Sequence, residues 1–394
     1  MRIGIDIRHL SARKHTGVEE YTYNLLSALF CLDRQDQFVL LYNSFHKKLP
    51  PEAEAWKRFP NVEIIELSWP SRLLNSSLYL LGLPRLDKLV GGVNVFFFPN
   101  ITFSRVSANI PFVVTFHDLS FEMLPHLFDS YRRLWHFLVN PRQMAQKASA
   151  VLTVSHSTAE DLKKIYRLDS QKIFPVYLGL DNIFLKTLDL KYQMLIRRSL
   201  PSYSEEKIQR FYRLPEKPFI LYLGTLEPRK NIANIIRAFE IFKKKTHSPH
   251  KLVIAGAPGW SFQAILVQAK KSLFKDSIYL SGPIFNQDRP ALYKMADLFV
   301  FPSFLEGFGL PPLEAMASGT PVVCSASSSL LEIFGSYTLM ANPHDIGELA
   351  WVIERGVSDS RLRKNLVTKG MAYAQNFTWE KTAKQTLAVL KSVA

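Results

Sequence analysis

Two glutamates stand eight residues apart in the otherwise apolar segment FLEGFGLPPLEAMASGTPVV, residues 304–323. Glu306 is expected in a loop, and Glu314 in the first turn of the following helix, where the helix dipole alone would stabilise it. A carboxylate in apolar surroundings loses hydration and needs hydrogen-bond donors in return. Because a carboxylate only accepts hydrogen bonds, the pair suits a ligand rich in hydroxyl groups, such as a sugar and a ribose. Gly307 and Gly309 give the loop freedom to present backbone N–H groups as well.

A second candidate site follows the strand that ends at Gly224, in LYLGTLEPRKNIANIIRAFE. A helix is expected to start near Pro228, which places Arg229 and Lys230 in its first turn. Two cations there oppose the helix dipole, at about 0.3–1 kcal/mol each, whereas a bound anion would be attracted by the amides, the dipole and both cations. The segment therefore predicts a phosphate site. The alternative is that Glu227 pairs with one cation and nothing else is bound.

Two further segments leave their interpretation open. Gly17 lies just before a predicted helix in TGVEEYTYNLL. A glycine there lets backbone amides approach a phosphate, although glycine is common at helix starts. His117 and Asp118 end the apolar strand VVTFHD. At the mouth of a cleft such a histidine can bind a polar ligand, but a lone histidine is more often structural.

Several motifs of other enzyme classes are missing from the sequence. No G-x-G-x-x-G follows the first strand and no G-x-x-x-x-G-K-[ST] occurs, so hydride transfer and P-loop chemistry lose support. There is no D-x-D, no H-E-x-x-H and no Cys or His cluster at ligand spacing. We therefore expect no metal site, and Arg229 and Lys230 would neutralise the charge that a divalent ion neutralises elsewhere.

Positioning these residues requires two series of strands and helices. The apolar runs RIGIDIR, FVLLYN, VEIIEL, VNVFFFP, PFVVTFHD and AVLTVSHS in the first half, and FILYLGTL, KLVIAGAP, SIYLSGPI, DLFVFPS and TPVVCSA in the second, are predicted strands. Long helices are expected over residues 18–31 and 131–149. This alternation predicts an α/β protein with two doubly wound, Rossmann-like domains. Ligands of such sheets bind beyond the carboxyl ends of the strands, so the cleft between the domains is the default site.

The domain boundaries are predicted where the alternation of strands and helices stops. We expect a first domain over residues 1–180 and a second over residues 218–376. The polar, Arg-rich segment 181–217 would join them and contain a helix from about Ser204 to Tyr212. Residues 377–394 are predicted to form a further amphipathic helix.

The chain of 394 residues is basic, with 49 Lys and Arg against 34 Asp and Glu and a net charge of +15. Such a surplus points to an anionic partner, either nucleic acid, a phosphorylated ligand or an acidic membrane surface, and a solvated basic face explains it equally well. Recognisable nucleic-acid-binding motifs are absent, so we expect no nucleic acid partner. Basic residues recur over residues 131–172 and at Arg197, Arg198 and Arg210.

The segment SRLLNSSLYLLGLPRLDKLV, residues 71–90, is apolar enough to dock at a bilayer interface, and a buried helix of the first domain explains it nearly as well. No apolar run is long enough for a membrane span, and the N-terminus lacks a signal-peptide pattern. Cys31 and Cys324 are the only cysteines, too few for a disulfide framework. We expect a cytoplasmic protein that is either soluble or in peripheral contact with an anionic membrane at its inner face.

Together, GTLEPRKN, the E-x7-E pattern from Glu306 to Glu314, HD at His117 and GVEEYTYNL resemble the retaining GT-B glycosyltransferases of the large group-4 (glycosyl transferase group 1) family. The resemblance covers nearly the whole chain. It implies a metal-independent hexosyltransferase, with mannose as the preferred sugar. The donor would be GDP-mannose or a UDP-sugar, and no other cofactor would be needed. The acceptor would be a glycan or a lipid-diphosphate-linked saccharide in cell-surface polysaccharide synthesis. Another GT-B chemistry, such as a nucleotide-sugar epimerase or a phosphorylase, is the alternative.

The resemblance also implies individual roles. Arg229 and Lys230 would hold the donor diphosphate and stabilise it as the leaving group. Glu306 would contact hydroxyls of the transferred sugar, and Glu314 would bind the ribose. His117 would face the donor sugar near the reacting centre. The remaining donor contacts would come from Gly224, from the amides of Gly307, Phe308, Gly309 and Leu310, and from Gly17 in the other domain. Thr16 stands where relatives often carry a second glycine, and the last helix of this fold typically crosses back to the first domain.

Overall fold

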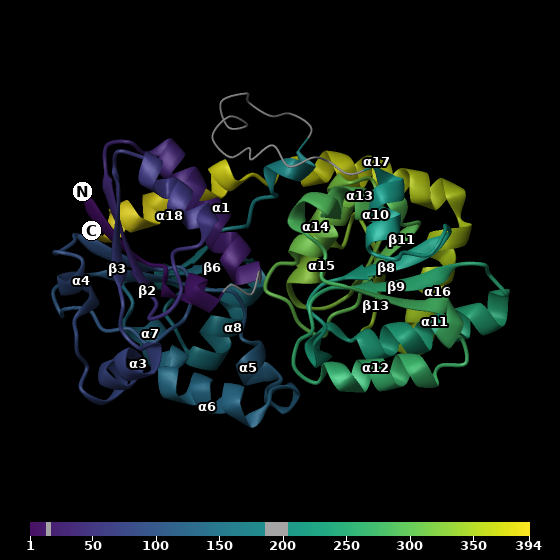
Figure 1. Ribbon diagram of the computed structural model, residues 1–394, viewed down its shortest axis with the longest axis horizontal. Coiled ribbons are helices and arrows are strands. Elements are labelled where there is room, and N and C mark those ends of the chain that lie inside the picture. The colour runs from purple at the N-terminus through teal and green to yellow at the C-terminus, as the bar shows by residue number, and fades with distance from the viewer. Residues whose placement is uncertain (13–16, 186–203) are drawn as a thin grey trace. The chain divides into compact units, whose positions relative to one another are not determined.

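The computed structural model describes residues 1–12, 17–185 and 204–394, and the chain divides into two compact units (Figure 1). Unit 1 consists of Met1–Gly179 and Thr378–Ala394, and unit 2 of Leu180–Phe377. The predictions that concern Thr16, Arg197 and Arg198 lie outside the described residues.

A seven-stranded parallel sheet forms the centre of unit 1, in the order β3-β2-β1-β4-β5-β6-β7. Its strands are β1 (Arg2–Asp6), β2 (Gln37–Asn43), β3 (Val62–Leu67), β4 (Val95–Phe98), β5 (Phe112–Phe116), β6 (Ala150–Thr153) and β7 (Ile173–Pro175). Both β4 and β6 are buried along their whole length, as expected for strands covered on two faces. Figure 1 shows α1 (Gly17–Leu32) on one side of the sheet and α8 (His156–Tyr166) on the other. The sequence pattern did not predict β7, which is only three residues long.

One long helix of unit 1 is broken where the sequence predicted continuity. The prediction of one helix over residues 131–149 is wrong, because the structure has two separate helices there, α6 (Ser130–Val139) and α7 (Pro141–Lys147). Pro141 has no N–H group and disfavours a helical conformation of the residue before it. Asn140 accordingly adopts a left-handed conformation with φ of 53°, and its side chain accepts a hydrogen bond from the Gln143 amide at 3.1 Å.

The last helix, α18 (Trp379–Val393), packs on α1. The chain reaches it through a close approach of two backbones, because a Cβ on Gly179 would lie 2.2 Å from the amide nitrogen of Trp379. Thr382 then donates its hydroxyl to the carbonyl of Tyr177 at 2.8 Å. At its far end Lys391 pairs with Asp33 at 2.7 Å. Side-chain contacts therefore fasten both ends of α18 within unit 1.

Unit 2 contains a six-stranded parallel sheet in the order β10-β9-β8-β11-β12-β13. Its strands are β8 (Phe219–Leu223), β9 (Lys251–Ala255), β10 (Ile278–Gly282), β11 (Leu298–Phe301), β12 (Val322–Ser325) and β13 (Leu339–Ala341). Its helices are α10 (Glu205–Phe211), α11 (Ile232–Thr246), α12 (Phe262–Lys271), α13 (Arg289–Met295), α14 (Leu310–Ala317), α15 (Ser328–Phe334), α16 (Ile346–Ser358) and α17 (Ser360–Ala374). The two helix-flanked parallel sheets confirm the prediction of two Rossmann-like domains.

The strand order reverses once in each sheet, between β1 and β4 in unit 1 and between β8 and β11 in unit 2. In open parallel sheets, ligands bind beyond the carboxyl ends of the strands at such a switch point. The loops that follow these strands are therefore the places to look for a site. No helix within the described ranges is long and apolar enough to cross a membrane.

Candidate active site

Two loops meet at the switch point of unit 2. One runs from Gly224 to Asn231 after β8, and the other from Pro302 to Gly309 after β11. The amide of Phe304 donates to the carbonyl of Arg229 at 3.0 Å, and the side chain of Asn231 donates to the carbonyl of Pro302 at 3.0 Å. These hydrogen bonds hold the loops together, so that side chains far apart in sequence meet at one place.

The two cations come from a short 3₁₀ turn, Pro228–Lys230, which precedes α11. The prediction that they occupy the first turn of the helix is wrong. Asn231 separates the turn from the helix, because it adopts a left-handed conformation with φ of 60°. Hydrogen bonds from its side chain to the carbonyls of Pro302 and Pro343 stabilise that conformation. The helix dipole therefore contributes less at the cations than the sequence suggested.

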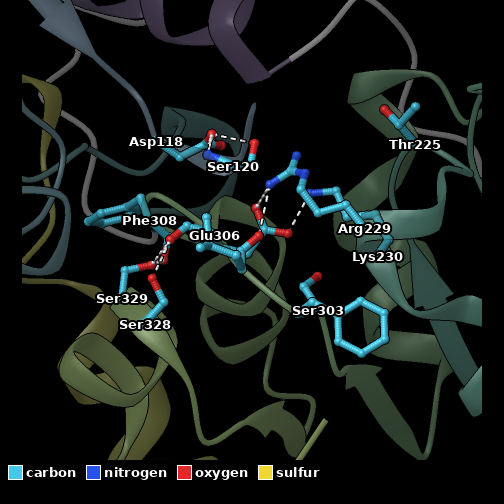
Figure 2. Close-up of polar contacts among 12 residues, drawn as sticks. Asp118, Ser120, Thr225, Arg229, Lys230, Ser303, Glu306, Phe308, Ser328 and Ser329 are labelled. Atoms are coloured by element: carbon cyan, nitrogen blue, oxygen red, sulfur yellow. Dashed lines mark hydrogen bonds and ion pairs between the residues drawn. The ribbon is translucent and has the colours of Figure 1, made fainter. Parts of the chain in front are cut away.

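Glu306 contacts both cations (Figure 2). Lys230 Nζ lies 2.5 Å from Glu306 Oε1, and Arg229 Nη1 lies 3.2 Å from Oε2. Arg229 also donates to Glu227 Oε1 through Nη2 at 2.9 Å and to the carbonyl of Leu305 at 2.9 Å. The pairing of Glu227 with a cation, which the sequence left open, is thus present together with the contact to Glu306.

These four charged side chains are largely removed from solvent, with exposures between 7 and 14%. Burial alone would raise the pKa of Glu306, but the charges of Arg229 and Lys230, with the hydrogen bond from Lys230, hold the pKa below its ordinary value. Glu306 is therefore a hydrogen-bond acceptor at neutral pH. Burial and the charges of Glu227 and Glu306 raise the pKa of Tyr222 well above its ordinary value, so this phenol stays neutral.

Serine hydroxyls hold the loop that carries Glu306 from its other side. Ser328 and Ser329, at the start of α15, donate to the carbonyl of Glu306 at 3.0 and 2.8 Å (Figure 2). Ser325, at the end of β12, donates to the carbonyl of Ser303 at 2.6 Å. The sequence interpretation missed these residues. The run SASSS after a predicted strand was the available signal, because such hydroxyls commonly bond nearby backbone groups.

The residues next to Glu306 are packed into unit 2. Gly307 is buried, and the ring of Phe308 lies 5.8 Å from that of Phe377. Gly309 has φ of +103°, and a Cβ there would lie 2.6 Å from Leu330 Cδ2. A larger residue at this position would be strained in its backbone and would have to displace the Leu330 side chain. Leu310 is the first residue of α14.

Glu314 lies in the second turn of α14, not in the first as predicted, because the helix already begins at Leu310. The side chain is buried and bonds to α13, with Arg289 Nη1 at 3.1 Å from Oε1 and the hydroxyl of Tyr293 at 2.8 Å from Oε2. The sequence interpretation did not identify these two partners. Glu314 thus belongs to a different set of contacts from Glu306.

Gly224 follows β8 directly, and its amide donates to the carbonyl of Ala255 at 3.1 Å. A Cβ on Gly256 would lie 1.8 Å from the carbonyl oxygen of Gly224. A side chain at residue 256 would therefore collide with the backbone that follows β8. The sequence AGAPG was the signal for this second glycine, which was not predicted.

His117 follows β5 in unit 1. Its Nε2 lies 2.9 Å from the carbonyl of Pro99, and its ring meets the ring of Tyr21 edge-on at 4.8 Å. Burial lowers the pKa of His117, so the imidazole is neutral, Nε2–H donates to Pro99, and Nδ1 is an acceptor. Asp118 accepts hydrogen bonds from the amide and hydroxyl of Ser120, at 2.9 and 2.6 Å, at the start of α5 (Ser120–Met123).

The end of β1 and the turn after it contribute polar and charged groups that the sequence interpretation missed. Arg8 and Asp6 form a buried ion pair at 2.6 Å, and His9 Nε2 lies 2.9 Å from Thr22 Oγ1. Burial lowers the pKa of His9 to about 4. Gly17 is the first residue of α1, exposed, and among the described residues no heavy atom lies within 4 Å of a Cβ placed on it.

Comparison with known proteins matches each half of the chain to a glycosyltransferase family. Residues 204–372 match the family described as glycosyl transferases group 1, and residues 15–182 match glycosyltransferase family 4. The chain is 31% identical to O-antigen chain mannosyltransferase B of Escherichia coli over 279 residues. This alignment covers 71% of this chain and 70% of that protein. The chain is 30% identical over 252 residues to serotype-specific mannosyltransferase WbdA of Escherichia coli, covering 63% of this chain and 29% of WbdA.

Among solved structures, Anabaena Alr3699/HepE in complex with UDP and glucose aligns over 100% of both chains, with a TM-score of 0.71 and 18% identity. At this identity the likeness concerns the fold alone.

Proposed function

Since this chain belongs to the group 1 glycosyltransferases of the GT-B fold, we propose that it transfers mannose from a nucleotide-linked donor, best GDP-mannose, to a saccharide acceptor. Two relatives at 31 and 30% identity are named mannosyltransferases, and one of them is named for the O-antigen chain. These names support polysaccharide synthesis as the setting. The acceptor we propose is a glycan or a lipid-diphosphate-linked saccharide.

The observation that carries this proposal is the pair of cations at the switch point of unit 2. Within the described part of the chain, Lys230 makes one hydrogen bond, to Glu306, whereas an ammonium group has three N–H donors. Lys230 can therefore bind diphosphate oxygens while keeping Glu306. The planar guanidinium of Arg229 also suits phosphate. Cations fixed in advance where negative charge develops lower the barrier for departure of a diphosphate.

The carboxylates would then hold the sugar and the nucleoside. Glu306 is ionised and can accept hydrogen bonds from hydroxyls of the transferred sugar, while Ser328 and Ser329 fix its backbone. Glu314, fixed by Arg289 and Tyr293, would accept from the ribose. His117 presents a neutral Nδ1 acceptor, which suits a sugar hydroxyl.

The remaining donor contacts predicted from the sequence would be made by backbone groups. Gly224 and the amides of Gly307, Phe308, Gly309 and Leu310 would approach the donor sugar and phosphates, and Gly17 would approach the phosphates from unit 1.

We propose a retaining mechanism with front-face attack. The bond between the anomeric carbon and the β-phosphate oxygen breaks, and its electron pair stays on the phosphate facing Arg229 and Lys230. The acceptor hydroxyl attacks the same face and gives its proton to the departing phosphate oxygen. Because two side chains supply the positive charge, turnover should persist in a chelator such as EDTA.

A donor panel tests the proposal. The purified chain is incubated with GDP-mannose, UDP-glucose and UDP-N-acetylglucosamine, each with a lipid-linked saccharide extract, and products are identified by mass spectrometry. We expect extension by a hexose from GDP-mannose, with an α-linkage that retains the donor configuration. Isomerised donor in reactions without acceptor would support the epimerase alternative instead. Absence of product with every donor would contradict the proposal.

A further inference from the structure

Two helices of unit 1 expose large apolar side chains. On α6, Tyr131, Leu134 and Phe137 recur at every third position and are 54 to 77% exposed. On α3 (Ser71–Leu80) and the residue after it, Leu73, Leu80 and Leu81 are 67 to 73% exposed. We call these six side chains the apolar ridge. Exposed apolar surface gathered in one place commonly marks an interaction site.

The orientation of both helices is fixed by their other faces. On α6, the ring of Trp135 lies 6.3 Å from Phe103, and His136 stacks on Phe121 at 4.3 Å. On α3, Leu74 and Leu78 are buried in the core. Each helix is thus apolar on its inner face and carries the ridge outside, so the exposure is not a consequence of poor packing.

The two helices are neighbours. The ring of Phe103 lies between them, 6.4 Å from Tyr79 of α3 and 6.3 Å from Trp135 of α6. Figure 1 shows α3 and α6 at the same lower edge of unit 1. A hollow of about 1790 Å³ is lined by both, including Tyr79, Leu134 and Phe137. Of the ridge itself, Leu134 and Phe137 line this hollow, whereas α3 contributes Leu78 and Tyr79 to the lining and carries its ridge residues beside them.

The hollow is positively charged. Its lining includes the cations Arg85, Arg105, Arg133, Arg142 and Lys147. Glu122 is the acidic side chain in the described lining, and it accepts a hydrogen bond from Tyr166 at 2.8 Å. Arg133, Arg142 and Lys147 are exposed to solvent. This excess of positive charge favours an anionic partner.

We propose that the apolar ridge and the cationic hollow form the surface by which this protein docks on an anionic lipid bilayer. Aromatic and aliphatic side chains would enter the headgroup region, and Arg133, Arg142 and Lys147 would contact lipid phosphates. This surface lies within unit 1 and goes beyond the proposed transfer reaction. Within residues 71–90, Leu74 and Leu78 belong to the core while Leu73, Leu80 and Leu81 are exposed, so the core explanation holds for one face of α3 and the proposal concerns the other.

Charge decides between a bilayer and a second copy of the chain. In a symmetric dimer the same surface faces itself, so the cations of one hollow would oppose those of the other. A bilayer that contains phosphatidylglycerol has an anionic headgroup surface above an apolar interior. The cations of the hollow match the first, and the apolar side chains of the ridge match the second.

Vesicle co-sedimentation of the full chain tests this proposal. Vesicles of phosphatidylcholine mixed with phosphatidylglycerol are compared with vesicles of phosphatidylcholine alone, and we expect binding to the anionic vesicles that weakens in high salt. Replacing both rings, Tyr131→Ser with Phe137→Ser, should lower the partition coefficient by about tenfold or more. Arg133→Gln with Arg142→Gln should lower it by about fivefold for each charge removed.

Matched controls lie in unit 2. Leu273→Ser removes an apolar side chain that is 87% exposed, and Lys270→Gln with Lys271→Gln removes two exposed cations. Both controls should bind as the parent does. Circular dichroism and thermal unfolding verify that every variant is folded.

Three results would overturn the proposal. The first is no binding of the parent chain to anionic vesicles. The second is equal binding by the ring and charge variants. The third is a dimer of the parent chain, seen by sedimentation without vesicles, that the ring variant abolishes.

Discussion

Replacing Lys230 with methionine removes one ammonium group from the candidate site and leaves an unbranched side chain of similar length. The ammonium nitrogen of Lys230 lies over an aromatic ring, 5.2 Å from the centroid of Phe301, so an unbranched apolar side chain at this position can contact the same ring. Methionine keeps an apolar contact with the ring and loses the cation. The variant therefore tests the charge more than the volume.

Two effects of different size should follow. Losing one preorganised donor toward developing negative charge typically lowers kcat by about 10²–10³-fold, or about 2.7–4 kcal/mol. Glu306 loses its 2.5 Å contact to Lys230 but keeps Arg229 at 3.2 Å, so it is not left unpaired. The free energy of unfolding should therefore fall by about 1.5–3 kcal/mol, the range for one hydrogen bond to a charged group.

The stability difference should also depend on pH. The lowered pKa of Glu306 stabilises the fold above the ordinary glutamate value of 4.5, and this contribution is lost as pH falls through the folded-state pKa. Without Lys230 the pKa is lowered less. The parent and the variant should therefore differ most near neutral pH and converge in acid.

The assay combines steady-state kinetics on donor and acceptor with urea unfolding at several pH values. The control is Lys270→Met, which replaces an exposed lysine of unit 2. It should match the parent in its kinetic constants and in its free energy of unfolding. A folded Lys230→Met variant that turns over within about threefold of the parent would refute the role of this lysine.

Other predictions concern the same loops and the switch point of unit 1. Gly309→Ala should lower the free energy of unfolding by about 1–3 kcal/mol in urea, because of φ at +103° and the 2.6 Å approach to Leu330, whereas Gly17→Ala should change it by less than about 0.5 kcal/mol. Ser328→Ala with Ser329→Ala removes two hydrogen bonds to the Glu306 carbonyl and should lower kcat about tenfold with little change in nucleoside diphosphate affinity; a parallel loss of affinity would contradict a role confined to the sugar loop. Because burial lowers the pKa of His9 from 6.5 to about 4, the unfolded chain takes up its proton first as pH falls, so stability drops across that range, and His9→Gln should make the drop shallower in urea titrations at each pH.

Strands and switch-point loops could be predicted because period and composition are local properties. The fully apolar runs VFFF and AVLT in the first half are strands buried on both faces, as predicted. The helix over residues 18–31 is present as α1, and that over residues 204–212 as α10. Each has a strong local signal and no internal breaker.

The two errors in helix boundaries have different causes, one a tertiary contact and the other a local helix breaker. The start of α11 is displaced by Asn231, whose left-handed conformation is stabilised by carbonyls more than 70 residues away, at Pro302 and Pro343. The single helix expected over residues 131–149 overlooked the effect of Pro141 on Asn140. The first of these errors could not be avoided from one sequence, but the second could.

The partners of the predicted site residues were the least predictable part. The sequence indicates that Arg229, Lys230 and Glu306 are unusual, but not that their side chains meet. Arg289 and Tyr293 reach Glu314 from a helix over 20 residues earlier in the chain, and no local pattern indicates that contact.

The central claim is that the cations at the β8–β11 switch point bind the diphosphate of a nucleotide sugar. A crystal structure of the chain with GDP tests it most directly. We expect diphosphate oxygens within hydrogen-bond distance of Lys230 Nζ and the Arg229 guanidinium, with the ribose at Glu314. GDP bound elsewhere, with Arg229 and Lys230 keeping their contacts to Glu306, would contradict the claim.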